Sequence, residues 1–277
     1  MTGTRVHRIS SPAGPERDNE DALWEREGVA VLVDGAGLPR DLRAGCGHSV
    51  AWFARSVAEG LGRRLDDRDL PAERALHDTL EAVAGSHGPG CDLGAGSPSG
   101  TVVGWRASGD DLELVVLCDS SVILVGDAGV RHVSDDRIDE AIHPQVAALV
   151  AEDEDAGTVV DGLRRSAHHR TVLEATRNVP GGFWCAHTDP AAADEALIWT
   201  EPLGAWSHVI LASDGATRAF QRLGTHTLGE FAAACVAGRL EQVRDAVRAA
   251  ETAAADELRA AGTKVHDDLT ILVTGLP

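Results

Sequence analysis

The sequence predicts an α+β layered fold, and two observations lead to that prediction. Segments rich in Val, Ile and Leu follow one another with hairpin turns between them, whereas segments with helical periodicity occur in pairs. A parallel doubly wound sheet would instead alternate strands and helices strictly along the chain. With 277 residues, the chain is long enough for one large hydrophobic core or for two smaller ones.

The strands are the clearest predicted elements. A hairpin is expected in "VILVGDAGVRHV", where the chain would close between Gly126 and Gly129. Strand composition and turn residues at the ends mark six segments: 29–34, 101–105, 112–119, 121–126, 208–214 and 269–275.

Two helices are predicted between the first two of these strands. Residues 71–84 have an apolar face, and Pro71 is well placed to begin that helix. Residues 85–100, rich in Gly, Pro and Ser, are expected to form a long loop, and further helical regions cover 139–177, 227–236 and 239–261. In residues 41–62, apolar side chains recur at spacings of three and four, as one buried face requires: Val50, Phe53, Ala54, Val57, Ala58 and Leu61.

The charge of the chain limits its partners. With 44 acidic and 25 basic residues, the net charge is −19, which disfavours binding to nucleic acid or to an anionic membrane surface. No stretch approaches the roughly 18 consecutive apolar residues of a membrane span. The first residues contain no apolar segment of signal-peptide length. The sequence therefore predicts a cytoplasmic protein with neither a nucleic-acid nor a membrane partner.

The cysteines and histidines do not form a recognisable motif. The five cysteines, at positions 46, 91, 118, 185 and 235, are scattered and include no CxxC pair. This pattern indicates reduced thiols and argues against a structural zinc site. None of the twelve histidines is expected to take part in the functional site.

Acidic residues recur at the ends of the predicted strands. A buried carboxylate costs several kcal/mol unless it is paired or bound to a metal, and no arginine directly flanks these acids. A shared divalent cation would compensate them, and oxygen ligands suit the hard ions Mg²⁺ and Mn²⁺. Each acid alone is explained by a turn or a strand boundary, so the interpretation depends on their joint occurrence. The acids are Glu20 and Asp21 in "RDNEDAL", Asp34 in "VDGAG", Asp119 in "CDSS", Asp214 in "ASDG", and Asp267 and Asp268 in "HDDLTILV".

In this order, the motifs resemble those of the metal-dependent protein phosphatases of type 2C. The set "RDNEDA", "VDGAG", "SGTVVGW", "CDSSVIL", "ASDG" and "HDDLTILV" extends from about residue 17 to 273. The surrounding stretches "VDGAGLPRDLRAG" and "PGGFWCAHTDP" are more similar to the divergent bacterial branch than to the eukaryotic one. The resemblance implies a four-layer α-β-β-α sandwich, with two antiparallel sheets packed face to face and flanked by helix pairs. Because the last predicted strand carries a motif, residues 1–277 are expected to form a single domain.

The resemblance also implies a role for each matching residue. Two Mg²⁺ or Mn²⁺ ions, with a weaker third, would lie in a cleft at one end of the sandwich. Asp34 and the Gly35 carbonyl would bind metal, Glu20 would serve one ion, Asp214 and Asp267 the other, and Asp119 the third. Asp21 would orient a metal-bound water, and Ser99, Gly100 and Thr101 would pack beneath the cleft.

The sequence departs from the family pattern at three places near these motifs. The arginine that usually stands four residues before the motif glutamate is replaced by Glu16, and Arg17 follows one residue later. Arg17 is therefore a candidate phosphate contact or a surface cation. Ala36 occupies the position of the histidine that eukaryotic members propose as general acid. "CDSS" replaces the usual "GDSR", which weakens the expectation of a third ion.

The segment 134–185 contains no motif of the family, although the family carries a substrate flap there. Its stretch "LRRSAHHR" offers Arg164, Arg165 and Arg170, which would either contact a phosphopeptide or form a solvated helix face.

The expected function is hydrolysis of phosphoserine or phosphothreonine by a metal-activated water, on a phosphoprotein made by a bacterial serine/threonine kinase. Two alternatives remain open: a phosphohydrolase of small phosphate esters, and a catalytically weak or inactive family member that acts as a binding module. A haloacid-dehalogenase site is excluded, because it needs a second aspartate two residues from the first, where Leu32 and Ala36 stand.

Overall fold

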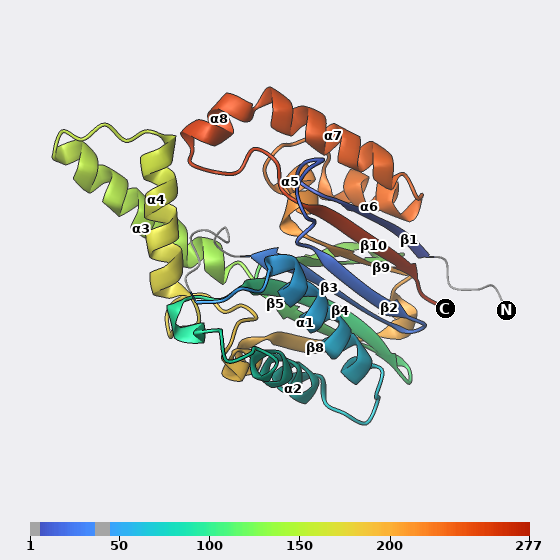
Figure 1. Cartoon of the computed structure of the whole chain (residues 1–277). Coiled ribbons are helices and arrows are strands. Elements are labelled where there is room, and N and C mark those ends of the chain that lie inside the picture. Colours follow the sequence, from blue (N-terminus) through green and yellow to red (C-terminus); the bar gives the residue numbers. More distant parts are fainter. Residues whose placement is uncertain (1–5, 37–44) are drawn as a thin grey trace.

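Two antiparallel sheets form the centre of the computed structural model, which describes residues 6–36 and 45–277. Both sheets contain five strands, and we call them the β10 sheet and the β3 sheet after their inner strands (Figure 1). The β10 sheet has the order β1 (Val6–Ser11), β10 (Leu269–Gly275), β9 (His208–Ala212), β6 (Ser121–Gly126), β7 (Gly129–Val133). The β3 sheet has the order β2 (Ala22–Arg26), β3 (Val29–Ala36), β4 (Ser99–Ser108), β5 (Asp111–Leu117), β8 (Leu197–Pro202).

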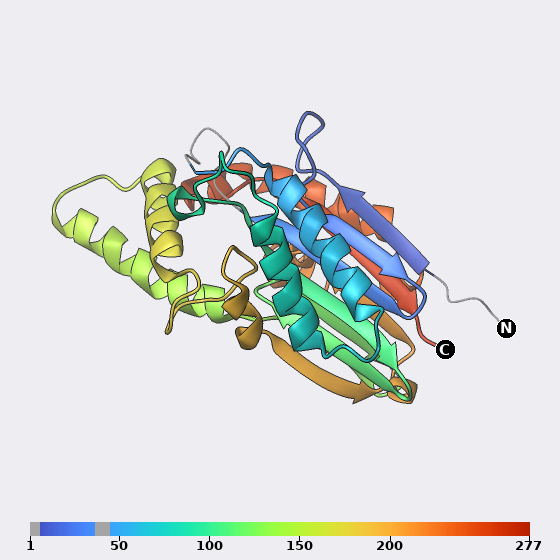
Figure 2. The same ribbon diagram turned by 60° about the horizontal axis from the view of Figure 1, so that its bottom comes forward.

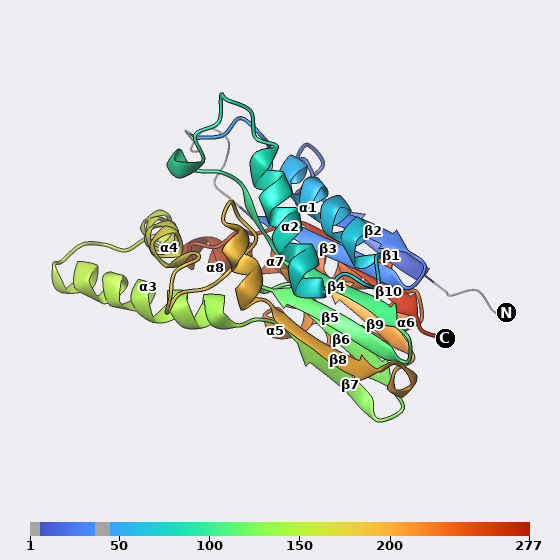
Figure 3. The same ribbon diagram turned by 90° about the horizontal axis from the view of Figure 1, so that it is seen from below.

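Helices cover the outer face of each sheet. The β3 sheet is covered by α1 (Val50–Leu65) and α2 (Ala72–Gly85), as Figure 2 shows. The β10 sheet is covered by α5 (Asp214–Gln221), α6 (Leu228–Val236) and α7 (Leu240–Ala253). The predicted four-layer α-β-β-α sandwich with two antiparallel sheets is therefore confirmed (Figure 3). The remaining short helices are α8 (Ala255–Ala260) and the 3-10 segments η2 (Leu93–Ala95), η3 (Pro190–Glu195) and η4 (Leu203–Ala205).

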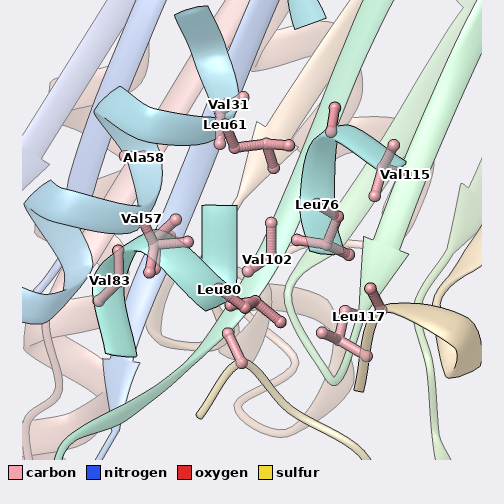
Figure 4. Packing of buried hydrophobic residues seen from close by; sticks show 14 of the residues in the cluster. Val31, Val57, Ala58, Leu61, Leu76, Leu80, Val83, Val102, Val115 and Leu117 are labelled. Atoms are coloured by element: carbon pink, nitrogen blue, oxygen red, sulfur yellow. The ribbon is translucent and has the colours of Figure 1, made fainter. Parts of the chain in front are cut away.

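A hydrophobic layer fills the space between each pair of neighbouring layers. Between the sheets, Leu32, Val103 and Leu114 of the β3 sheet meet Leu124 and Leu211 of the β10 sheet. Strands buried on both faces read as near-continuous apolar runs, which explains why their sequences were the clearest signals. On the outer side of the β3 sheet, the apolar faces of α1 and α2 pack on the strands (Figure 4), with Val57, Leu61, Leu76 and Leu80 above Val31, Val102 and Val115.

All six predicted strands are present, and Gly126 pairs with Gly129 at the predicted hairpin. Strands β1, β2 and β8 were not predicted. All three lie at an edge of their sheet. Their sequences mix charged and apolar residues, because an edge strand is only partly buried. Because β2 was not predicted, the first strand expected after Glu20 and Asp21 was the one at 29–34. In the structure these two acids directly precede β2.

The helices differ from the prediction mainly at their ends. Helix α1 begins at Val50, because Ser49 caps it by accepting a hydrogen bond from Trp52 N at 3.0 Å. Of the predicted 41–62 helix, residues 41–44 lie outside the described residues, as does most of "GLPRDLRAG". A further helix, α5, begins at Asp214, where the sequence predicted only a turn.

The predicted helical region 139–177 consists of two helices, α3 (Arg137–Asp155) and α4 (Gly162–Thr176). They form a hairpin that projects beyond the sheets, at the left of Figure 1. Ile142, Val146 and Val150 of α3 pack with Val172 of α4 in a small hydrophobic cluster. This cluster also contains Cys118, Phe183 and Cys185, so it joins the hairpin to the end of the sandwich. This hairpin occupies the segment in which the sequence contained no family motif.

Candidate metal centre

The acids predicted from the motifs meet at one end of the sandwich. Asp34 lies near the end of β3 and pairs with Thr101 of β4. Ala22 pairs with Val33, so the β2–β3 ladder places Asp21 across from Asp34. Directly opposite residues of neighbouring strands project on the same face, which brings these two carboxylates together.

Asp119 and Asp214 join this group from the other sheet. The chain leaves β5 for β6 at Cys118, whose φ of 70° is a left-handed conformation that side chains rarely adopt. Ser121 of β6 pairs with Ala212 of β9. Asp119 lies two residues before Ser121, and Asp214 lies two residues after Ala212, so both stand beyond the same edge of this ladder. The link between the sheets therefore carries one acid to the cleft.

Burial and mutual repulsion raise the pKa values of these carboxyl groups. Burial is the main cause of the rise at Asp34, followed by the charges of Asp21, Asp214, Asp267 and Asp119. The pKa of Asp21 and that of Asp119 are each raised to about 7, again mainly by burial. Such a cluster is unfavourable when all its members are ionised, unless positive charge enters among them.

The hydrogen bonds of the acids fit a cation ligand set. Both carboxylate oxygens of Asp21 and Oδ1 of Asp119 are buried, without a hydrogen-bond partner in the described residues. The hydroxyls of Thr270 and Ser213 partly offset the raised pKa of Asp21, but neither makes a hydrogen bond of normal geometry with it. Among the described residues, no Lys or Arg forms an ion pair with Asp21, Asp34, Asp119 or Asp214. Unpaired buried oxygens of this kind are the ligands that Mg²⁺ and Mn²⁺ take in proteins.

Asp267 differs from the other acids because two cations contact it. Arg218 Nη2 donates to Asp267 Oδ2 at 2.9 Å, and Lys264 Nζ donates to Oδ1 at 3.0 Å. Neither Arg218 nor Lys264 was predicted to contact Asp267, because neither is directly beside an acid of the cluster in the sequence. Arg218 lies four residues after Asp214, one turn along α5, and that helix was not predicted. The charge of Asp267 is thus compensated by the protein, and its carboxylate is held in a fixed orientation.

Two glycines allow the backbone to approach closely at the cleft. Gly35 N donates to Glu20 O at 3.2 Å, and a Cβ on Gly35 would lie 2.5 Å from that oxygen. A Cβ on Gly215, directly after Asp214, would lie 1.9 Å from Asp268 O. The approaching groups are therefore backbone carbonyls of the protein itself.

Asp268, which had no predicted role, anchors the segment that carries Glu20. Its carboxylate accepts hydrogen bonds from Glu20 N at 2.6 Å and from Ala13 N at 2.7 Å. The Glu20 side chain is half-buried, and burial raises its pKa while the charge of Lys264 opposes the rise. Glu20 thus lies beside the cluster, held there through its backbone.

Arg17, the candidate phosphate contact or surface cation, does not line the small cavity at the acids, although its charge acts on Glu20. It is exposed, and its guanidinium has no hydrogen bond or ion pair within the described part of the chain. The cations that line the small cavity at the acids, of about 100 Å³, are Lys264 and Arg177. Arg177 Nε is buried without a hydrogen-bond partner in the described residues. No sequence signal pointed to Arg177, because it lies in the segment without family motifs.

Two of the three residues that the resemblance placed beneath the cleft lie at the cavity. Ser99 and Thr101 line the same cavity of about 100 Å³, and Ser99 Oγ donates to Ala36 O at 3.0 Å. A larger cavity of about 520 Å³ lies beside it, and the two share Asp119, Asp214 and Ile138. The larger cavity is lined by α3, α4 and α5, so the projecting hairpin forms one wall of a hollow next to the acids.

None of the three arginines of "LRRSAHHR" lines either cavity at the acids. Arg164 is paired with Asp153 of α3 at 2.6 and 2.7 Å, and Arg170 donates to Ser166 at 3.2 Å. His168 also contacts Asp153, at 2.7 Å, whereas the adjacent His169 lines the larger cavity. Adjacent helical residues point in different directions, as this division shows.

Two antiparallel sheets between helix layers, with a carboxylate cluster at one end, define the fold class of the type 2C phosphatases. Known structures of bacterial serine/threonine phosphatases share this fold along nearly their whole length. The phosphatase PstP of Mycobacterium tuberculosis is 17% identical over 99% of this chain and 98% of its own, with a TM-score of 0.58. Stp1 of Staphylococcus aureus is 15% identical over 100% and 96%, with a TM-score of 0.56. PppA of Pseudomonas aeruginosa is 18% identical over 99% and 98%, with a TM-score of 0.55.

At these identities the similarity establishes the fold, as the motifs predicted. A structure of the PstP catalytic domain with two manganese ions is also similar, at 17% identity and a TM-score of 0.54. No family model and no curated protein match the sequence itself. None of the helices in the described residues has both the length and the apolar character of a membrane span.

Proposed function

We propose that this chain is a metal-dependent serine/threonine protein phosphatase that hydrolyses phosphoserine or phosphothreonine in a phosphoprotein. One observation carries the proposal: four carboxylates converge at one end of the sandwich, and no ion pair in the described residues compensates them. They are Asp21, Asp34, Asp119 and Asp214. The shared fold supports the proposal, since PstP, Stp1 and PppA have the same architecture and PstP is known with two manganese ions.

The residues that would hold two Mg²⁺ or Mn²⁺ ions are Glu20, Asp34, Asp214 and Asp267, together with the Gly35 carbonyl. Asp119 would add a ligand for a third. When bound, these ions would place positive charge at the phosphoryl oxygens and activate a water for in-line attack. Asp34 is central, because the charges of Asp21, Asp119, Asp214 and Asp267 all act on it. Arg218 and Lys264 hold Asp267 in place through hydrogen bonds to its two oxygens.

Asp21 would orient a water molecule beside the ions. Its two oxygens have no partner in the described residues, so both are available for this role. In the metal-free chain, burial raises the pKa of Asp21 to about 7, and cations bound among the acids would lower that pKa. Ala36 offers no proton donor at the neighbouring position.

The substrate phosphate would meet Arg177 and Lys264, in place of the usual arginine that this chain lacks. Both line the cavity that contains Asp34, Asp119 and Asp214. The residues flanking the phosphorylated side chain would lie in the cavity of about 520 Å³ between α3, α4 and α5. The α3–α4 hairpin would then contribute to substrate selection, as the flap does in the family that the motifs resemble.

The wider context of this function also remains a prediction. The substrate would be a phosphoprotein of a bacterial serine/threonine kinase, and residues 1–277 would act as one domain. Nucleic acid is disfavoured as a partner by the net charge of −19. A cytoplasmic location rests on the sequence alone.

Manganese-dependent release of phosphate from a phosphothreonine peptide tests this function. We expect turnover by the wild-type chain, and a loss of at least about 100-fold in kcat/KM for Asp34→Asn, as for removal of a strong electrostatic contact. Asp245→Asn, at an exposed acid on α7, serves as the control. Turnover of small esters alone would identify the phosphohydrolase, and manganese binding without turnover of any substrate would identify the binding module.

A further inference from the structure

Two cysteines and two histidines from distant parts of the sequence meet away from the carboxylate cluster. Cys46 and His48 directly precede α1, whereas His87 and Cys91 follow the end of α2. One ligand atom from each of the four residues lies within 4.8 Å of the other three. The two segments also pair through their backbones, since Asp92 N donates to Gly45 O at 2.6 Å.

Four of the six distances between the ligand atoms match the edges of a metal-centred tetrahedron, and all six are within 4.8 Å. Zinc bonds of about 2.3 Å to sulfur and about 2.05 Å to nitrogen require S···S near 3.8 Å and S···N near 3.6 Å. Cys46 Sγ lies 3.7 Å from Cys91 Sγ. The sulfur–nitrogen distances are 3.4 Å from Cys46 to His48 Nδ1 and to His87 Nδ1, and 3.5 Å from Cys91 to His48 Nδ1.

We propose that Cys46, His48, His87 and Cys91 bind one Zn²⁺ ion in a closed structural site. Two thiolates and two neutral imidazoles form the Cys₂His₂ ligand set that is typical of tetrahedral zinc. On binding, each thiol releases its proton to solvent, and the two thiolate charges neutralise the dication. Four protein ligands leave no open position, so the site has a structural and not a catalytic role.

The neighbouring residues hold the ligands in this geometry before a metal arrives. His48 N donates to Cys46 Sγ at 3.3 Å, which is a contact that favours the thiolate. Trp52, one turn into α1, stacks on the His48 ring with a centroid distance of 4.0 Å and an interplanar angle of 27°. Burial and the nearby His48 lower the pKa of His87, which keeps its imidazole neutral and able to bind metal.

The fold explains why the sequence argued against a zinc site. Zinc motifs are recognised from ligands in short pairs such as CxxC, and here each short pair combines one cysteine with one histidine. Because α1 and α2 run antiparallel, the start of the first lies beside the end of the second (Figure 2). Only the antiparallel packing of α1 and α2 brings Cys46 and Cys91 together.

The zinc site would hold the start of α1 next to the carboxylate cluster. Val50, the first residue of α1, would lie 2.5 Å from a Cβ on Gly35, so this helix start packs tightly against the strand of Asp34. A zinc ion at residues 46–48 would fix this contact, yet its ligands are sulfur and nitrogen and not the oxygen ligands of the carboxylate cluster. The two sites therefore differ in metal preference and can be tested separately.

Metal content of the purified chain provides the first test. After dialysis against excess Mg²⁺, wild type should retain one zinc per chain by inductively coupled plasma mass spectrometry. Cys46→Ser/Cys91→Ser should bind zinc more than about 100-fold more weakly, because losing two ligands costs more than losing a hydrogen-bond partner of a ligand. His77→Ala, at a half-buried histidine of α2 outside the group, and Asp34→Asn should both retain it. Retention of zinc by the double cysteine variant would overturn the proposal.

A second test uses wild type alone, so it does not depend on the folding of a variant. Cobalt added to the zinc-free chain should give the strong visible bands of tetrahedral Co²⁺ and a thiolate-to-cobalt charge-transfer band. Alkylation followed by mass spectrometry should label Cys46 and Cys91 much more slowly with zinc than without it, whereas buried Cys235 should not change. Equal labelling and no charge-transfer band would contradict the site, whatever the phosphatase activity proves to be.

Discussion

Arg218 donates hydrogen bonds to two acids at once, from Nη2 to Asp267 at 2.9 Å and from Nη1 to Glu251 at 3.0 Å. Glu251 is fully buried and also contacts Arg248 and His266. Arg218 is therefore a positioning residue that links the metal centre to a buried ion-pair network.

Arg218→Ala should lower the free energy of unfolding by about 2–3 kcal/mol, less than the 3–5 kcal/mol of a fully stranded buried charge, because other partners remain. The melting temperature should fall by about 5–10 °C in a chain of this size. The control is Arg259→Ala, which removes an exposed ion pair with Asp256 and should change the melting temperature by less than about 2 °C. Equal melting curves for the two variants would show that the network does not stabilise the fold.

Gly215→Ala should destabilise the chain because α5 begins against the backbone of Asp268. The added Cβ would lie 1.9 Å from Asp268 O, so the helix must shift, at a cost of at least about 1–3 kcal/mol. Gly229 is the matched control, since it is also the second residue of a helix, α6, and has open space around it. Gly229→Ala should be neutral or stabilise by up to about 1 kcal/mol. Chemical denaturation measures both, and equal effects would refute the close approach at Gly215.

The metal-free chain should lose stability as the pH rises from 5 to 8. The folded pKa values of Asp21 and Asp119, about 7, lie above the usual value near 4, so the folded state binds protons more strongly than the unfolded state. Their stabilising contribution is therefore present at low pH and is lost as the pH rises through about 7. A fall of roughly 5 °C or more in melting temperature is expected.

Manganese should reverse this loss, raising the melting temperature more at pH 8 than at pH 5, because protons compete with the cation for the same oxygens. Asp21→Asn/Asp119→Asn should flatten the pH dependence of the metal-free chain. Equal pH dependence of wild type and this double variant in the absence of metal would contradict the raised pKa values.

Arg177→Ala should raise KM for a phosphothreonine peptide about tenfold or more while changing kcat less, because the guanidinium would bind the phosphate in the ground state as well. The control is Arg170→Ala, at an exposed arginine of α4 that contacts only Ser166 in the described residues. Steady-state kinetics at saturating manganese separates the two parameters. An unchanged KM in Arg177→Ala would show that Arg177 does not bind the phosphate, which would favour Arg17 for that contact.

The parts of the fold that could be predicted are those buried on both sides. Strands such as β3 and β10 are continuous apolar runs, and the acids at their ends are visible against that background. Edge strands β2 and β8 carry polar residues on their exposed faces, so their composition resembles that of loops.

The acids of the site were predictable, whereas the residues that support them were not. Asp34 and Asp214 occur in short motifs, and their positions follow from local sequence. Lys264 and Arg218 lie three and four residues from Asp267 and Asp214, but their contacts depend on a local structure that was not predicted. Arg177 reaches the cleft only through tertiary packing. The same holds for Cys46 and Cys91, which α1 and α2 separate in the sequence.

The most direct test of the metal centre is a crystal structure of the chain with Mn²⁺, with anomalous scattering used to locate the ions. We expect two manganese peaks about 3.5–4 Å apart, with Asp34 between them and with Asp214 and Asp267 among the ligands. Well-ordered carboxylates at Asp34 and Asp214 with no anomalous peak between them, at saturating manganese, would contradict this expectation.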